Sequence, residues 1–135
     1  MLSRTAAREL AFELIFEWTF RNESIADILD AAVEARQVEN DPFARETACG
    51  VIEHLSQIDE TICAHLKGWS ITRISKVALS VLRLSVYEIL FTDIPDSVSI
   101  NEAVELAKKY GGDDDPSYVN GVLGGVTRGR EVTSQ

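Results

Sequence analysis

Few side chains in this 135-residue chain are able to carry covalent or metal chemistry, and their spacing does not gather them. Cys49 and Cys63 form no C-x-x-C pair, and together with His54 and His65 they match none of the usual zinc-ligand spacings. The aspartates of residues 113–115 lack the later carboxylate of a calcium loop, so they are typical of a solvated turn and helix cap. No nucleophile stands beside a base. We therefore predict a protein that is not an enzyme and uses no cofactor or metal.

Basic and aromatic side chains are the remaining candidates for function. Arg4 and Arg8 lie one helical turn apart near the start of the chain. Their spacing alone favours a solvated helix face over contacts with phosphate groups. Tyr118 fits equally well as a core aromatic and as a platform on which a nucleobase stacks. The other candidates are Lys76, Lys108, Lys109, Arg73, Phe16 and Trp18.

The charge of the chain is strongly negative and unevenly spread. The net charge of −9 argues against a nonspecific nucleic-acid binder, which normally presents a basic surface. Residues 67–92 nevertheless carry a net +3, whereas residues 37–66 carry a net −5. This asymmetry permits one basic face on an acidic body.

Helical periodicity runs along most of the chain and strand-type alternation is scarce, so we expect an all-α protein in a single domain over residues 1–135. The first apolar pattern extends from Ser3, a suitable cap, to about Phe20, and the second begins at Ser24. A third pattern over 41–68 opens with an aspartate cap and a proline, and it fits either one helix or two that meet near Leu55.

The second half of the chain contains the most apolar segment. Residues 71–91 are apolar on nearly every side, which predicts a central, buried helix over about 75–91. Arg83 lies inside this helix and needs a partner there, for which Glu88 and Glu102 are the candidates.

Two shorter helices are expected after the central one. Ser99 and Glu102 have the spacing of a capping box, and Gly111 stands where a left-handed glycine would end that helix. The last helix begins at about Asp115, with Pro116 in its first turn.

Three segments resemble the NusB family of transcription antitermination factors. They are Ala7-Arg8-Glu9 at the start of the first helix, the run 81–89 (VLRLSVYEI) in the central helix, and the run from Ile100-Asn101-Glu102-Ala103 to Val122-Leu123. Trp69 and Arg73-Ile74 also stand in family-like places between them. The similarity follows nearly the whole chain in the right order, and the third segment is its most specific part.

The resemblance implies a fold, a function and partners. The fold would be two packed three-helix sub-bundles with about six or seven helices in total. The protein would bind boxA-type single-stranded RNA together with NusE, a small-subunit ribosomal protein, and would act in the antitermination complex of RNA polymerase on ribosomal RNA operons. RNA contacts would fall on Arg4, Arg8, Lys76, Lys108, Lys109 and Tyr118, and partner contacts on Phe16, Trp18 and Arg73.

The N-terminus departs from the arginine-rich start of many family members, because only Arg4 and Arg8 are present there. Fewer cations weaken the attraction for phosphate. A helical interaction or homodimerisation module with weak or no RNA binding therefore remains the alternative function. Kinship with the NusB-like N-terminal domain of RNA cytosine methyltransferases is a third hypothesis, disfavoured because no cofactor-binding domain accompanies it. No apolar run reaches the length of about 20 residues that a membrane span needs, and a cytoplasmic location is expected.

Overall fold

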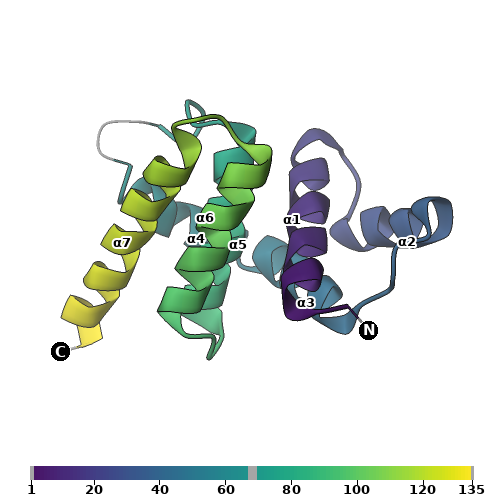
Figure 1. Cartoon of the computed structure of the whole chain (residues 1–135), viewed down its shortest axis with the longest axis horizontal. Helices are drawn as coiled ribbons and strands as arrows, with labels where there is room; N and C mark the ends of the chain where they lie inside the picture. Colours follow the sequence, from purple (N-terminus) through teal and green to yellow (C-terminus); the bar gives the residue numbers. More distant parts are fainter. Residues whose placement is uncertain (1, 67–69, 135) are drawn as a thin grey trace.

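The computed structural model describes residues 2–66 and 70–134, with residues 130–134 described by their backbone alone. This part of the chain forms seven helices and no strand, which confirms the predicted all-α fold (Figure 1). The helices are α1 (Arg4–Phe20), α2 (Ile25–Arg36), α3 (Pro42–Glu53), α4 (Leu55–Cys63), α5 (Lys76–Phe91), α6 (Asp96–Tyr110) and α7 (Asp115–Ser134). None of the described helices is both long and apolar enough to cross a membrane. Trp69 and the expected helix end at residues 67–68 lie outside the described residues.

Local capping fixes several of the helix starts. The side chains of Ser3, Ser24 and Ser75 each accept a hydrogen bond from the backbone N–H three residues further on. Asp41 does the same at α3, with a proline in the first turn of that helix. His54 separates α3 from α4, so the pattern over 41–68 consists of two helices.

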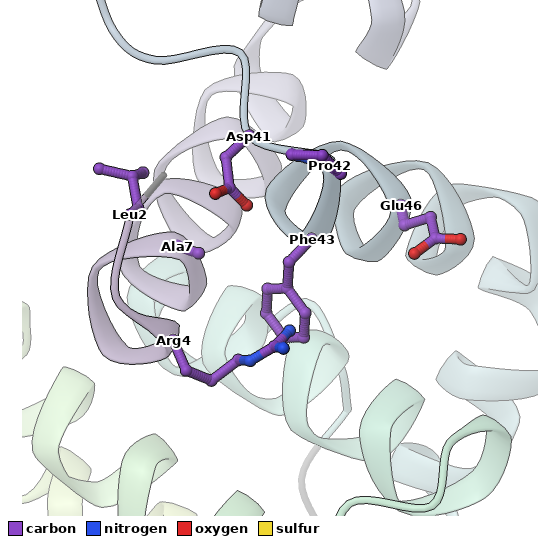
Figure 2. Close-up of a pocket in the computed structure, with 7 residues that line it drawn as sticks. All are labelled: Leu2, Arg4, Ala7, Asp41, Pro42, Phe43 and Glu46. Carbon is purple, nitrogen blue, oxygen red and sulfur yellow. The ribbon is translucent and has the colours of Figure 1, made fainter.

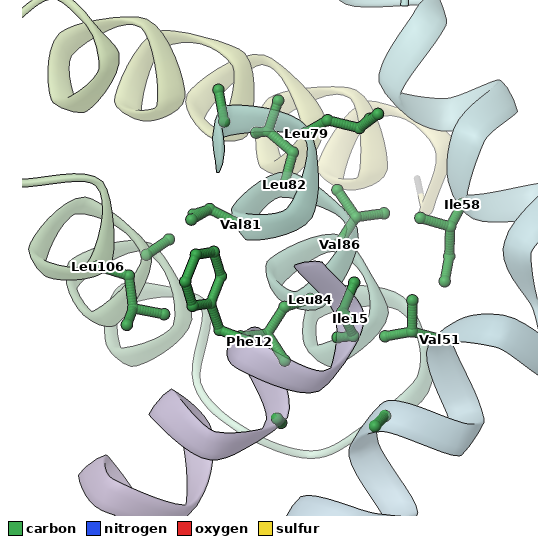
Figure 3. Packing of buried hydrophobic residues seen from close by; sticks show 14 of the residues in the cluster. Phe12, Ile15, Val51, Ile58, Leu79, Val81, Leu82, Leu84, Val86 and Leu106 are labelled. Atoms are coloured by element: carbon green, nitrogen blue, oxygen red, sulfur yellow. The ribbon is translucent and has the colours of Figure 1, made fainter. Parts of the chain in front are cut away.

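Helix α5 is the centre of the molecule, as its apolar sequence predicted. It contacts α1, α3, α4, α6 and α7. Its side chains interlock with apolar residues from these neighbours, among them Phe12 of α1 and Leu106 of α6 (Figure 3). The helices α1, α2 and α3 pack on one another, and α5, α6 and α7 do the same, which is the expected pair of sub-bundles. Helix α5 therefore joins the two sub-bundles into one core.

Two predictions about α6 are wrong. The helix begins at Asp96, with Pro95 in the capping position, so Ser99 lies inside its first turns. The Ser99 hydroxyl is buried and donates a hydrogen bond to Glu88 Oε1 at 2.9 Å, which excludes the capping box. At the other end, Gly111 has φ −98° and ψ −176°, an extended rather than left-handed conformation. Glycine is required there because an added Cβ would lie 2.8 Å from the Ala107 carbonyl oxygen.

Candidate nucleic-acid interface

The candidate site lies along α1 and α6, which run side by side (Figure 1). Near the start of α1 the Thr5 hydroxyl donates to Glu102 Oε1 at 3.0 Å. Further along, Lys109 Nζ donates to Glu9 Oε1 at 2.6 Å. Because both contacts advance in the same direction along both helices, α1 and α6 are parallel. This arrangement brings the exposed lysines at the end of α6 onto the α1 surface.

Arg8 occupies the interior of this region rather than its surface. Its Nε donates to Glu88 Oε2 at 2.8 Å, and the two side chains are 3% and 1% exposed. Its Nη1 lies 3.6 Å from Glu102 Oε1 and forms no hydrogen bond within the described residues. We call Arg8 and Glu88 the inner ion pair. A phosphate contact needs an exposed guanidinium, so the structure does not place Arg8 where its predicted role requires.

The inner ion pair also corrects the prediction for Arg83. Arg83 does not pair with Glu88 or Glu102. It instead donates two hydrogen bonds of 2.9 Å each to the carboxylate of Asp59 on α4, a bidentate arrangement. Glu88 is left to accept from Arg8 and Ser99, which joins α5 to α1 and α6.

The exposed basic side chains among the predicted RNA contacts are Arg4, Lys76, Lys108 and Lys109, and we call them the outer cations. Lys108 Nζ lies 3.2 Å from Glu105 Oε1, and Lys109 pairs with Glu9 as described above. Both lysine side chains stay 59% exposed, so water and an incoming phosphate reach them. The face is therefore a mixed strip in which cations alternate with carboxylates.

A hydrogen-bonded cluster holds the end of α6 on α1. Tyr110 Oη lies 2.5 Å from Glu9 Oε1 and 3.0 Å from Glu13 Oε1. The hydrogen bonds from Lys109 and then from Tyr110 lower the pKa of Glu9 below its ordinary value. Burial, followed by the hydrogen bonds to Glu9 and Glu13, raises the pKa of Tyr110. Glu9 therefore stays charged and orients the neighbouring lysine.

Arg73 and Tyr118 share a pocket of about 250 Å³ where the start of α5 meets the start of α7. The Tyr118 hydroxyl is buried without a hydrogen-bond partner in the described residues, and burial raises its pKa. Asp114 lines the same pocket, while Asp115 Oδ2 accepts from the Ser75 hydroxyl at 3.0 Å. Tyr118 was predicted to contact RNA and Arg73 to contact the partner protein. The structure brings the two residues together in one pocket.

Phe16 opens onto a second groove, of about 350 Å³. The apolar part of its lining comes from Phe12, Phe16, Val77 and Tyr110. Trp18 does not line this groove, because residues two positions apart on a helix point about 200° away from each other. The structure therefore separates the two predicted partner contacts of α1, and it joins Phe16 to the start of α5.

Acidic side chains border the same groove. Glu13 and Glu17 line it from α1, and Arg36 of α2 closes its far side. The nearest Arg36–Glu17 approach is 3.7 Å. The groove is therefore an apolar floor with a largely acidic edge, which suits a partner that presents apolar and basic side chains.

The site has the chemistry of a binding surface. No group of three or more potential metal-binding side chains occurs in the described part of the chain. The outer cations, the half-buried Tyr118 and an aromatic groove instead lie along α1, α6 and the starts of α5 and α7. Phosphate groups, nucleobases and protein side chains are the ligands that such groups bind.

Comparison with known sequences assigns the chain to a protein family. The chain is 42% identical over 131 residues to the transcription antitermination protein NusB of Helicobacter hepaticus. The aligned region covers 95% of this chain and 83% of that protein. It is 41% identical to the NusB protein of Bacillus pumilus, over 93% of this chain and 95% of that protein. The sequence model of the NusB family matches residues 5–128, and the chain belongs to this family.

Solved structures agree with that assignment. The NusB structure of T. maritima has a TM-score of 0.85 and 37% identity, over 94% of this chain and 92% of that one. A crystal structure of the antitermination factors NusB and NusE in complex with double-stranded RNA has a TM-score of 0.84 and 28% identity, over 93% of this chain and 96% of that one.

Some residues of the site escaped the sequence analysis. Tyr110 and Glu9 are 101 positions apart, so no local spacing points to their contact. Phe43 fitted the apolar pattern of its helix, yet its ring lies under the guanidinium of Arg4. The sequence showed that Arg4 lies near the start of the chain, but it does not reveal which aromatic ring the guanidinium covers.

Proposed function

We propose that this chain is an RNA-binding transcription antitermination factor that binds boxA-type single-stranded RNA together with NusE. The observation that carries the proposal is family membership over residues 5–128, joined to the likeness with a NusB–NusE–RNA complex. That complex contains double-stranded RNA, so the preference for a single strand is part of our proposal. Antitermination by RNA polymerase on ribosomal RNA operons is the biological role that we infer from it.

The RNA path that we propose follows the outer cations. It begins at Arg4, passes Lys108 and Lys109 at the end of α6, and continues past Lys76 to Tyr118. The end of α6 and the start of α5 are neighbours, since Tyr110 and Val77 line one groove. The cations attract phosphate groups, and Tyr118 offers an aromatic ring for a base. Arg8 has a positioning role in this proposal, because it holds α1 against α5 and α6.

The carboxylates along this path limit the affinity of the chain alone. Glu9 and Glu105 already pair with two of the outer cations, and Asp114 lies beside Tyr118. A basic partner that shares the RNA strand would offset this repulsion. We therefore expect weak binding without NusE and stronger binding with it.

NusE is proposed to dock on the groove beside Phe16 and Val77. The acidic edge of the groove suits a ribosomal protein, whose RNA-binding role calls for basic side chains. Trp18 and Arg73 do not line this groove, so their predicted contacts with the partner would lie outside it. Large exposed apolar side chains in the described part of the chain are Phe20 and Val98, near opposite ends of the parallel pair α1 and α6. They form no broad apolar patch of the kind that a homodimer needs.

A titration of labelled boxA-type RNA with the chain, with and without NusE, tests the proposal. We expect measurable binding by the mixture and at least about tenfold weaker binding by the chain alone. Sedimentation of the free chain gives its oligomeric state in parallel. Absence of RNA binding in both titrations, together with a stable dimer, would replace our proposal with the homodimerisation function.

A further inference from the structure

Phe43 and Arg4 form an exposed stack at the corner between α1 and α3. Phe43 is half-buried in the first turn of α3, and the Cζ atom of Arg4 lies 4.0 Å above the centre of its ring. Figure 2 shows the guanidinium lying across the ring. The Cζ atom of Arg8 is 5.5 Å from the same centre. The ring therefore holds a flat, delocalised cation at the distance of a stacked pair.

The stack borders a pocket of about 400 Å³, which we call the corner pocket. Leu2, Ala7 and Pro42 supply apolar surface around it. Asp41 also lines it and is only 2% exposed, with Oδ1 accepting the Ala44 N–H at 3.1 Å. An ionised carboxylate has about four lone-pair sites, so the cap leaves Asp41 able to accept further hydrogen bonds. The corner pocket thus combines an aromatic platform with a buried acceptor.

We propose that the corner pocket takes one nucleobase of the bound RNA, stacked on Phe43, with its exocyclic amino group donating to Asp41. The inference rests on the proposed RNA-binding function and extends the RNA path beyond Arg4 onto α3. A nucleobase has the flat shape and delocalised electrons of the guanidinium that now covers the ring. Arg4 is exposed, so it can swing off the ring and pair with the phosphate of the same nucleotide.

The geometry also sets a base preference. Adenine, cytosine and guanine carry an exocyclic amino group, whereas uracil does not. Asp41 accepts hydrogen bonds only, and the one polar donor of uracil, its N3–H, is flanked by two carbonyl oxygens, so uracil in this position brings a carbonyl oxygen against the carboxylate where the other bases bring an amino group. The corner pocket therefore discriminates against uracil at one position of the strand.

Abasic scanning of the RNA tests this inference. Single-stranded boxA-type RNAs of about 12 nucleotides, each with one abasic position, are titrated with the full chain in the presence of NusE. For the wild-type chain, one position in addition to that read by Tyr118 should be sensitive, with about tenfold weaker binding when its base is missing. Uracil at that position should weaken binding in the same direction.

Variants of Phe43 connect the sensitive position to the pocket. Phe43→Leu keeps an apolar side chain but removes the ring, so binding of intact RNA should weaken about tenfold and the sensitive position should lose its sensitivity. Phe43→Tyr keeps the ring and should bind like the wild type. Thermal unfolding by circular dichroism verifies that both variants are folded. Lys108→Ala is the matched control, because a lost phosphate contact weakens binding to every RNA of the series and leaves the sensitive position sensitive.

The possible outcomes separate this inference from the proposed function. If the wild type binds RNA and Phe43→Leu shows the same abasic profile, the function stands and the corner pocket does not bind a base. If Phe43→Leu instead weakens NusE binding without RNA, the pocket is a protein contact and our inference is wrong. If no RNA is bound by the wild type, the proposed function and this inference fall together.

Discussion

The inner ion pair ties α1 to α5 and the Lys109–Glu9 pair ties α1 to α6, but the two pairs differ sharply in their exposure to water. Arg8 and Glu88 are 3% and 1% exposed, whereas Lys109 and Glu9 are 59% and 26% exposed. Both pairs link α1 to a neighbouring helix over 2.8 Å and 2.6 Å respectively. Burial decides what each pair does. A buried charge must keep its partner, while an exposed charge exchanges its partner at little cost.

The difference assigns separate tasks to residues that look alike in the sequence. Arg4 and Arg8 are one turn apart, yet one is exposed and the other is inside the protein. The inner ion pair fixes the relative position of α1, α5 and α6, and the outer cations then project from that fixed frame. Substitutions at the two sites should therefore affect different measurements, stability in the first case and RNA affinity in the second.

The largest effect is expected from Arg8→Met. The variant leaves the Glu88 carboxylate buried without its cation, although Ser99 still donates one hydrogen bond to it. Removing one partner of a buried ion pair typically costs about 3–5 kcal/mol. Guanidinium denaturation followed by circular dichroism measures the loss in the free energy of unfolding. A loss below about 1 kcal/mol would show that Arg8 behaves like an exposed residue.

The next effect separates binding from stability. Lys108→Ala combined with Lys109→Ala removes two outer cations, so RNA affinity in the presence of NusE should fall about tenfold. The logarithmic dependence of affinity on salt should become shallower by about 1.4, as expected for two single-strand phosphate contacts. The free energy of unfolding should change by less than about 1 kcal/mol. Fluorescence anisotropy at several salt concentrations provides both binding measurements.

Glu105→Gln is the matched control for the lysine variant. Glu105 pairs with Lys108 on the exposed face of α6, so its neutralisation frees that cation. RNA affinity should rise rather than fall. An unchanged salt dependence in the double lysine variant, measured on folded protein, would move the RNA path away from the end of α6.

The local features of the fold were predictable from the sequence, while the inner ion pair was not. Helix starts at Ser3, Ser24 and Asp41 depend on side chains that cap an N–H three residues away. The same reasoning failed at Ser99, because Pro95 starts the helix earlier and Ser99 turns inward to α5. A local pattern identifies a candidate cap, but the position of the neighbouring helix decides whether the hydroxyl is free to act as one.

The contacts of the candidate site were still harder to predict, because they join residues far apart in the sequence. Arg8 and Glu88 are 80 positions apart, so no spacing rule pairs them. The sequence indicated a need for a partner at Arg83 but assigned it Glu88, which Arg8 occupies. The exposed lysines of α6 were predictable because charge at the end of an amphipathic helix faces water.

A smaller effect is expected where a carboxylate borders the RNA path. Asp114→Asn removes a negative charge beside Tyr118, so RNA affinity should rise about two- to fivefold. Asp93→Asn removes an exposed charge at the far end of α5 and serves as the control, with a smaller change expected. Competition titrations at fixed salt compare the two variants. Equal effects of the two substitutions would mean that only the net charge matters.

The smallest effect concerns the pH dependence of the ion pair between Lys109 and Glu9. Hydrogen bonds from Lys109 and Tyr110 lower the pKa of Glu9 in the folded protein below its ordinary value of 4.5. A lowered folded pKa means that the stabilisation is present above the unfolded pKa and is lost as the pH falls through the folded pKa. The Glu9→Gln variant lacks this carboxylate, so its free energy of unfolding should fall less than that of the wild type as the pH is lowered from about 6 to about 3. The difference should stay below about 1 kcal/mol because Lys109 is largely exposed. Urea denaturation across this pH range at constant ionic strength measures it, and parallel stability curves for the two proteins would show that this pair contributes nothing to the fold.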